Sequence, residues 1–347
     1  MSAYLRETIR LAAVATIALT AAIAPLSSVS SRSSALFPPA PLPATAPATA
    51  PAGAARPLCA YVASGEPDRG WTADVERALR ARLAGRCRLH VFHLGTAAAP
   101  GDAVRHLAAA IERLEPRVVI VSGDEVTRQL VVPHLLESDT PIIFAGADWS
   151  IAEHGPPPRH VSGVVETARI RPMLKAALLQ LGTVRRALHI GADTPAGRRY
   201  HRALQNVGES LGITIERVLV DRFDTWALAM ESSQHYALTV LGEPAGIAGW
   251  DSARAALLAR ARRQGLSVTN SRALTAHAAV GLTTVAEEHG DWAARTVLAV
   301  LDGIPVTRIP LVTSRRQDTW VNLDLMSRAR ITPDRRLLID AHQVAQR

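Results

Sequence analysis

The feature that most constrains this chain is an alternation of short apolar runs with helical patterns, which occurs twice in succession. Runs such as Val118–Ser122 are separated by segments whose apolar residues recur every three or four positions. Short continuous apolar runs suit strands that are covered on both faces of a parallel sheet. Because the alternation restarts after residue 165, we predict an α/β fold with two similar lobes, each a doubly wound parallel sheet.

The expected elements follow from these patterns. In the first run, strands are expected at residues 58–63, 88–94, 118–122, 141–145 and 161–165. In the second run, they are expected at residues 187–191, 214–220, 237–241, 266–269, 280–283, 309–312 and 319–323. Helices are expected at residues 74–83, 102–114, 124–133, 170–181, 196–211, 225–234, 251–263 and 285–301. The helix that begins near Asp124 is expected to end by Pro133, because proline donates no backbone hydrogen bond.

The first sixty residues predict the location of the protein. In residues 1–30, Arg6 and Arg10 precede an apolar stretch and small polar residues follow it, which is the layout of a secretory signal. Residues 31–57 are rich in Pro and Ala and are predicted to form a disordered linker. Cleavage would release the protein, whereas an uncleaved segment would anchor it. Either outcome predicts a folded part that is exported to the periplasm.

Cys59 and Cys87 are the two cysteines of the chain, and each lies at the start of an expected strand. Export favours a disulfide between them, provided that the two strands are neighbours. Two buried thiols in a well-packed sheet are the alternative, and the sequence leaves both open.

The basic charge does not indicate a nucleic-acid partner. The formal net charge is +8, but the basic residues are almost all Arg and are scattered over helical segments. Scattered arginines are typical of solvated helix faces rather than of a track that binds phosphates. Beyond residue 30, the sequence also contains no apolar run of the roughly 18 to 20 residues that a membrane span needs.

The candidate site lies in the loops that follow the expected strands, since open parallel sheets bind ligands beyond the carboxyl ends of their strands. Tryptophans and acids are frequent in these loops although the whole chain is basic. Such a site suits a small molecule with an amine or several hydroxyls. The predicted ligand-binding residues are Trp71, Asp124, Asp148, Trp149, Asp193, Thr194, Gly246 and Trp250. Helix capping by Asp124 and core packing by Trp250 are the alternatives for those two residues.

Motifs of catalysis and cofactor binding are missing from the sequence. It has no G-x-S-x-G elbow, no phosphate-binding G-x-x-x-x-G-K, no strand-linked G-x-G-x-x-G and no H-E-x-x-H. His90 and His93 would face opposite sides of one strand, so they are not expected to share a metal ion. We therefore expect a protein that is not an enzyme and that needs no cofactor.

Several segments together resemble a known family. They are VVIVSGD at 118–124, PIIFAGADW at 141–149, SGV at 162–164, GADT at 191–194, GIAGWD at 246–251 and EEHGDWAA at 287–294. In order and spacing these resemble substrate-binding proteins of uncharacterised ABC-type transport systems, which have the type 1 periplasmic-binding-protein fold. The resemblance implies two lobes joined by crossover strands, with a ligand cleft between them. It also implies that residues 58–164 are completed by about 280–308, and residues 165–279 by about 309–335.

These observations predict an exported solute-binding protein, a monomer that captures a small polar molecule for the membrane permease of an ABC importer. An amino acid or a related amine is the favoured ligand. The linker keeps a second hypothesis open, in which a tethered sensor reports a ligand to a membrane kinase or cyclase. A periplasmic enzyme and a protein-interaction module are further alternatives.

Overall fold

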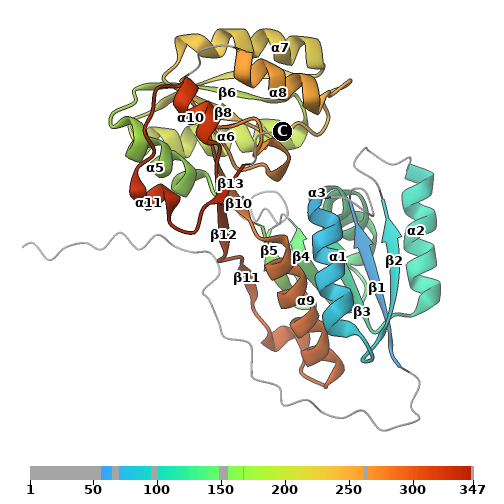
Figure 1. Ribbon diagram of the computed structural model, residues 1–347. Coiled ribbons are helices and arrows are strands. Elements are labelled where there is room, and N and C mark those ends of the chain that lie inside the picture. Colours follow the sequence, from blue (N-terminus) through green and yellow to red (C-terminus); the bar gives the residue numbers. More distant parts are fainter. Residues whose placement is uncertain are drawn as a thin grey trace, which may run out of the picture. The chain divides into compact units, whose positions relative to one another are not determined.

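The structure is a computed structural model that describes residues 56–64, 70–94, 101–147, 155–166, 168–261 and 265–344 (Figure 1). All of these belong to one compact unit of the chain, Phe37–Arg347. The predicted signal segment and almost all of the linker lie outside the described residues, as do Asp148 and Trp149. No helix in the described ranges is long and apolar enough to cross a membrane.

The first sheet has six strands in the order β11-β5-β4-β3-β1-β2. Its strands are β1 (Leu58–Ala63), β2 (Arg88–His93), β3 (Val118–Ser122), β4 (Ile142–Ala147), β5 (Val161–Val165) and β11 (Leu311–Thr313). Every neighbouring pair is parallel. Strands β3 and β5 are buried along their whole length, as the continuous apolar runs predict for a sheet covered on both faces.

Helices from opposite ends of the chain cover one face of this sheet. Figure 1 shows α1 (Gly70–Leu83) and α9 (Ala286–Leu301) side by side, although two hundred residues separate them in the sequence. Their apolar residues share one core cluster, with Val75 from α1 and Ala293 from α9. The helices approach so closely that a Cβ atom on Gly290 would lie 2.4 Å from the Val75 carbonyl oxygen. A residue with any side chain at position 290 would therefore push α9 away from α1.

The opposite face of the first sheet is covered by α2 (Gly101–Leu114) and by α3 (Asp124–Val126) with its continuation η1 (Thr127–Leu135). The expectation that this helix ends by Pro133 is wrong, because η1 continues to Leu135. Its turns are of the wider π type, and Leu136 N–H donates to the Val131 carbonyl at 3.2 Å. A π turn moves the hydrogen-bonding partners by one residue, which accommodates a proline that would interrupt an α-helix.

The second sheet has seven strands in the order β13-β12-β10-β9-β8-β6-β7. They are β6 (Arg186–Ala192), β7 (Thr214–Val220), β8 (Leu238–Leu241), β9 (Leu266–Thr269), β10 (Val280–Thr284), β12 (Gln317–Val321) and β13 (His342–Gln343). All pairs are parallel except β10 with β12, which is antiparallel.

Separate core clusters lie on the two faces of the second sheet. One contains residues of α5 (Ile170–Leu181) and α6 (Pro195–Glu209), and α10 (Leu323–Arg328) and α11 (Arg335–Leu338) also contribute to it. The other contains residues of α7 (Phe223–Ser232) and α8 (Ser252–Ala261). Each lobe is thus a sheet with helices on both faces, as the alternation of patterns predicts.

The chain passes between the two sheets three times: after β5, between β10 and α9, and between β11 and β12. This corrects the expected lobe boundaries near residues 280 and 309. Strand β10 pairs with β9 and β12, so it belongs to the second sheet, and β11 pairs with β5 in the first. The return to the first lobe therefore begins at α9, because the backbone of β10 already has its hydrogen-bonding partners in the second sheet.

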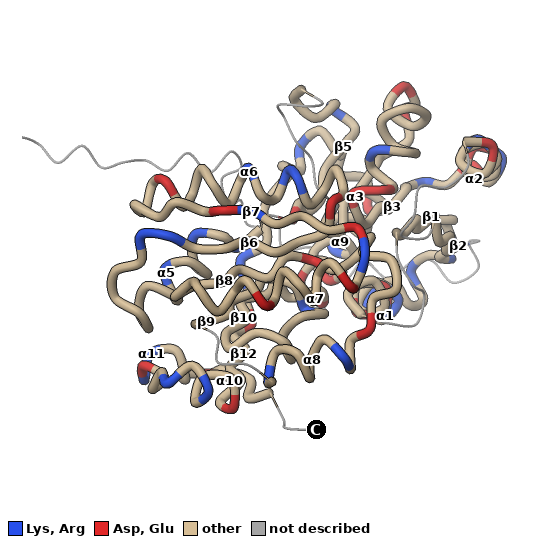
Figure 2. The backbone as a smooth tube through the Cα atoms, turned by 90° about the horizontal axis from the view of Figure 1, so that it is seen from above, with Lys and Arg blue, Asp and Glu red and all other residues tan. Residues whose placement is uncertain are grey.

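Charged residues of both signs are mixed along the helices rather than separated into regions (Figure 2). Many form pairs within one helix, such as Arg80 with Glu76 at 2.7 Å and Arg328 with Asp324 at 3.0 Å. Exposed pairs of this kind contribute little stability. They do indicate that many of the arginines lie on solvated helix faces beside acidic partners.

Candidate functional site

Each sheet has one place where the strand order reverses. In the first sheet, β1 lies between β2 and β3, so the chain leaves it in one direction and returns on the other side. In the second sheet, β6 lies between β7 and β8 in the same way. Crevices open beyond the carboxyl ends of the strands at such reversal points, and ligands bind there in open α/β sheets.

The crevice of the first lobe is formed by Ser64 after β1 and Gly123 after β3. Gly123 has φ 88°, and a Cβ atom on it would lie 1.7 Å from Ser64 Oγ. The Thr72 hydroxyl donates to the Ser64 carbonyl at 2.8 Å and ties this loop to the first turn of α1. Glycine is therefore required at position 123 both by its backbone conformation and by the hydroxyl beside it.

The second lobe repeats this arrangement with Thr194 after β6 and Gly246 after β8. Gly246 has φ 96°, and a Cβ atom on it would lie 2.5 Å from Thr194 Cγ2. Thr194 is the N-cap of α6, and its hydroxyl accepts a hydrogen bond from Gly197 N–H at 3.0 Å. Both crevices thus place a positive-φ glycine against a hydroxyl residue.

The predicted carboxylates at the crevices are partly engaged by arginines of α6. Asp124 is the first residue of α3, and its carboxylate lies 3.7 Å from the Arg199 guanidinium. Asp193 is exposed and is paired with Arg198. Both therefore stand at the carboxyl edges, as predicted, with arginines close by.

Glu243 is a carboxylate of the second crevice that the sequence reasoning missed. It directly follows the loop glycine after β8, and it accepts a hydrogen bond from the Ser271 hydroxyl at 2.6 Å. The side chain keeps an exposed surface, yet the surrounding protein is dense enough that desolvation raises the pKa of this carboxyl. No described Lys or Arg pairs with it. Its position immediately after a strand beside the reversal point was the available signal.

Trp71 lies at the carboxyl edge of the first sheet with a second residue that was not predicted, His289 of α9. The two rings meet edge to face, with centroids 5.3 Å apart. Gly146 in β4 fits against both, because a Cβ atom on it would lie 2.2 Å from Trp71 and 2.5 Å from His289 Nδ1. Burial and, to a smaller extent, the charge of Arg169 together lower the pKa of His289 to about 4, so the imidazole is neutral at pH 7. Sequence reasoning could not find His289, which comes from the far end of the chain.

Trp250 lies in the core of the second lobe. It packs edge to face against Trp226 and Phe223, at centroid distances of 5.0 and 5.7 Å. The packing alternative stated for this residue thus accounts for its position. The Asp251 carboxylate beside it accepts a hydrogen bond from Arg254 N–H at 2.9 Å and caps α8.

Both cysteines are free thiols and are buried in the core of the first lobe. They lie in hydrogen-bonding contact, which raises the pKa of the Cys59 thiol and lowers the pKa of the Cys87 thiol. The strands β1 and β2 are neighbours, as the disulfide hypothesis requires. The structure thus brings the two sulfurs together without a bond between them.

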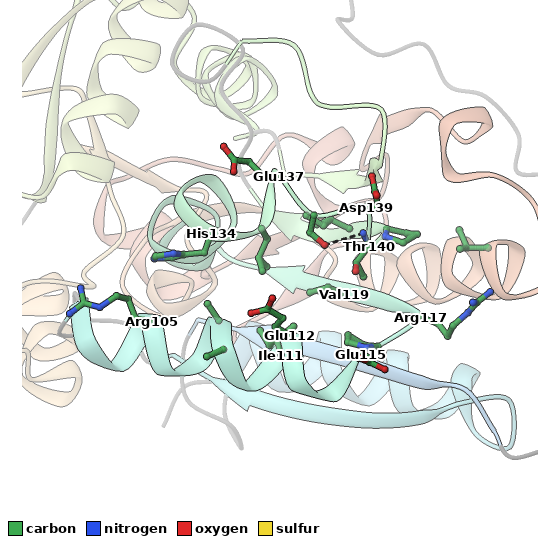
Figure 3. A pocket seen from close by; sticks show the side chains of 18 of the residues that line it. Arg105, Ile111, Glu112, Glu115, Arg117, Val119, His134, Glu137, Asp139 and Thr140 are labelled. Carbon is green, nitrogen blue, oxygen red and sulfur yellow. Dashed lines mark hydrogen bonds between the residues drawn. The ribbon is translucent and has the colours of Figure 1, made fainter.

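A cavity of 1020 Å³ in the first lobe lies away from these crevices. Figure 3 shows it between α2 and η1, near the starts of β3 and β4, with Arg105 and Glu112 on one side and His134 on the other. It therefore opens at the amino edge of the sheet, opposite the predicted site. Among the described residues, no three His, Cys, Asp or Glu side chains are grouped to hold a metal ion.

Solved structures identify this architecture. An ABC domain in complex with L-Trp from Streptococcus pneumonia aligns with a TM-score of 0.67 and 12% identity, over 84% of this chain and 100% of that one. The chain has the fold of type 1 periplasmic binding proteins. A ligand-free, open substrate-binding protein with adhesive properties from Clostridium difficile aligns with a TM-score of 0.65 and 11% identity, over 84% and 100% of the two chains.

A leucine-binding protein from Thermotoga maritima aligns with a TM-score of 0.52 and 13% identity, over 71% of this chain and 82% of that one. Searches of protein-family models and of curated proteins match nothing. The likeness is therefore one of fold, at identities too low to transfer a ligand.

Proposed function

We propose that this protein is an exported, non-catalytic receptor that captures a small polar molecule between its two lobes. The observation that carries the proposal is the matched pair of crevices, each at the reversal point of its sheet and each built from a hydroxyl residue and a positive-φ glycine. Among the described residues of the crevices named above, no nucleophile, base and orienting group are grouped, so these residues give no support to a triad-type enzyme. Solved structures of this fold include binding proteins for small molecules, which agrees with the proposal.

An amino acid or a related amine is the ligand we favour. Glu243 and Asp193 stand at the second crevice, and a desolvated carboxylate without a cationic partner, such as Glu243, attracts an ammonium group. Of the similar structures, one is a protein in complex with L-Trp and another is a leucine-binding protein. This supports the choice of amino acids as the first compounds to test.

Binding would act through hinge closure around the three crossovers. A ligand that contacts both lobes only in the closed state shifts the population toward closure, and a membrane protein can then recognise that state. The permease of an ABC importer is our first candidate for this partner. The Pro/Ala-rich linker favours a second candidate, a membrane kinase or cyclase, because a freely diffusing receptor has little need of a tether.

The experiment is native mass spectrometry of the protein purified from a periplasm after its own signal has acted. Extra mass that disappears on denaturation is expected, and it would identify a retained small molecule. A bare protein that also fails to bind any amino acid in titration calorimetry would contradict the receptor. A bare protein that still carries residues 1–30 and then binds a ligand would favour the tethered sensor.

Substitutions test the residues of the crevices. Asp193→Ala, and likewise Asp148→Ala, is expected to weaken binding of the retained molecule at least tenfold while the circular dichroism spectrum stays unchanged. Glu209→Gln, an exposed acid on α6, is the matched control. Normal binding by both aspartate variants would mean that this map of the crevices is wrong.

A further inference from the structure

Three side chains at the carboxyl edge of the first sheet leave buried polar atoms without partners. They are Trp71 Nε1, Arg169 Nε, and both ring nitrogens of His289; none has a hydrogen-bond partner among the described residues. His289 has no exposed surface. A buried polar atom that lacks a partner costs roughly 1 to 3 kcal/mol. Several such atoms in one neighbourhood therefore indicate that something else satisfies them when the protein works.

The unpartnered atoms favour an anion. Trp71 Nε1 and Arg169 Nε are donors, and a neutral His289 adds one more donor and one acceptor. The guanidinium of Arg169 carries a full charge, and its Nη2 donates to the Ser314 carbonyl at 2.6 Å, which neutralises none of that charge. Among the unpartnered atoms of these three side chains, donors thus outnumber acceptors. The three side chains together carry a positive charge, which is that of Arg169.

The acids that adjoin this neighbourhood in the sequence have other partners. Glu288 accepts hydrogen bonds from the backbone N–H groups of Arg315 and Arg316, at 3.0 and 2.8 Å. Glu166 accepts one from the Thr284 hydroxyl at 2.9 Å. Of the described residues, no carboxylate forms an ion pair with Arg169. Arg169 is therefore not ion-paired with a carboxylate within this part of the chain.

The three residues come from segments that only the fold brings together. Trp71 lies in the first turn of α1, Arg169 is the N-cap residue of α5 directly after the first crossover, and His289 lies in the first turns of α9. Trp71 and His289 both pack against Gly146, which lies near the carboxyl end of β4. The neighbourhood is thus at the carboxyl edge of the first sheet, where a ligand of this fold class binds.

We infer that Trp71, Arg169 and His289 form an anion subsite that takes the carboxylate of a small molecule. The inference rests on the proposed function and deepens it, since Glu243 of the second crevice would take a cationic group of the same molecule. The ligand class that follows is a compound with a carboxylate and an ammonium group. Trp71 and His289 would donate neutral hydrogen bonds, and Arg169 would supply the charge.

Acetate tests the subsite without knowledge of the natural ligand. The full chain is titrated with sodium acetate, and separately with acetamide, at pH 7 and constant ionic strength. The measured signal is the NMR resonance of the Trp71 indole N–H, assigned from its loss in Trp71→Phe. Acetate is expected to shift this resonance with saturation, and acetamide, its neutral analogue, to bind at least tenfold more weakly. Equal behaviour of the two compounds, or no saturable shift, would overturn the inference.

Two arginine variants locate the charge. Arg169→Met keeps an unbranched stem and removes the guanidinium, and it is expected to weaken acetate binding at least tenfold. Arg171→Met, two residues further along the same helix, is the matched control and should bind acetate as the parent does. Unchanged acetate binding in a folded Arg169→Met would also overturn the inference, and the wild-type comparison of acetate with acetamide stays decisive if that variant does not fold.

The outcomes separate the subsite from the receptor function. If the native spectrum reveals a retained molecule but acetate does not bind, the receptor stands and the carboxylate subsite is wrong. If acetate binds as expected but the protein neither retains nor binds any small organic molecule, the subsite stands and the receptor function is wrong.

Discussion

The two lobes share a backbone design but differ in the polar groups placed on it. At the reversal point of each sheet a positive-φ glycine lies against a hydroxyl residue: Gly123 against the Ser64 hydroxyl, and Gly246 against the Thr194 methyl group. Beside this contact the first lobe has the unpartnered N–H donors of Trp71 and His289, with Arg169 of the first crossover near them, whereas the second has the carboxylate of Glu243. A repeated backbone can therefore present opposite charges, because the reversal point fixes where a ligand lies while the side chains decide its chemistry.

Buried histidines differ between the lobes in the same way. His289 contacts the indole of Trp71, whereas His189 and His201 stack on each other with Nδ1 atoms 3.2 Å apart. A Cβ atom on Gly242 would lie 2.8 Å from His189 Nε2, so this pair lies directly beneath the second crevice. The second lobe thus stacks two imidazoles on each other in its core, where the first packs one against an indole at its edge.

The largest expected effect comes from breaking the first lobe alone. Gly290→Ala is expected to lower the free energy of unfolding by about 3 kcal/mol, because its Cβ would collide with the backbone of α1. Hydrogen exchange should accelerate in β1, β3 and α1 and stay unchanged in β6 and β8. Gly101→Ala, at the exposed start of α2, is the control and should be neutral. Equal loss of protection in both lobes would mean that they do not unfold separately.

Acid should weaken the second lobe. Burial and, to a smaller extent, His201 beside it together lower the pKa of His189 from 6.5 to about 3. Because the unfolded state binds the proton more tightly, stability is complete above pH 6.5 and is lost as the pH falls toward 3. His189 alone accounts for about 2 kcal/mol by pH 5. Urea unfolding of His189→Gln should show a smaller pH dependence, while the exposed His342→Gln should keep the parental one.

Charge complementarity can be tested from the second lobe as well. Glu243→Gln is expected to weaken the binding of methylammonium about tenfold, or about 1.4 kcal/mol, because the amide offers no charge. Acetate binding in the first lobe should remain unchanged in this variant. Titration calorimetry of the folded variant measures both, and an equal loss for the two probes would contradict the division of charge between the lobes.

The smallest expected effect concerns a helix start. Thr194→Ala removes the side chain that caps α6 and should lower the free energy of unfolding by about 1 kcal/mol. Thr194→Ser keeps the hydroxyl and should cost less than half of that. If thermal unfolding gives equal losses for the two variants, the contact of the Thr194 methyl with Gly246 matters more than the cap.

Periodicity was sufficient for most of the fold because buried parallel strands and amphipathic helices leave local signatures. Periodicity did not predict to which sheet a strand belongs. β10 and β11 have similar local patterns, and only their hydrogen-bonding partners assign them to different sheets. The helix end predicted from Pro133 was wrong, because the π turns of η1 accommodate the proline.

The site was predictable only where it follows a strand directly in the sequence. Asp193, Thr194 and Gly246 lie at a crevice because the loop after a parallel strand always reaches the carboxyl edge. Arg169 and His289 belong to helices that reach this edge through crossovers, and no local signal marks them. The long-range contacts that complete the site are thus what sequence reasoning lacked.

The placement of α9 and β11 in the first lobe bears on how the protein is made. Residues 58–166 supply most of that lobe, yet α9, which covers one face of its sheet together with α1, and the edge strand β11 come from residues 286–313. During synthesis the amino-terminal lobe must therefore wait, with apolar surface uncovered, until nearly the whole chain has emerged. The second lobe obtains all but β12, α10, α11 and β13 in one continuous stretch. The lobe that begins first along the chain is thus completed only after most of the other lobe has emerged. A chaperone that shields apolar surface on an emerging chain would therefore bind the first lobe.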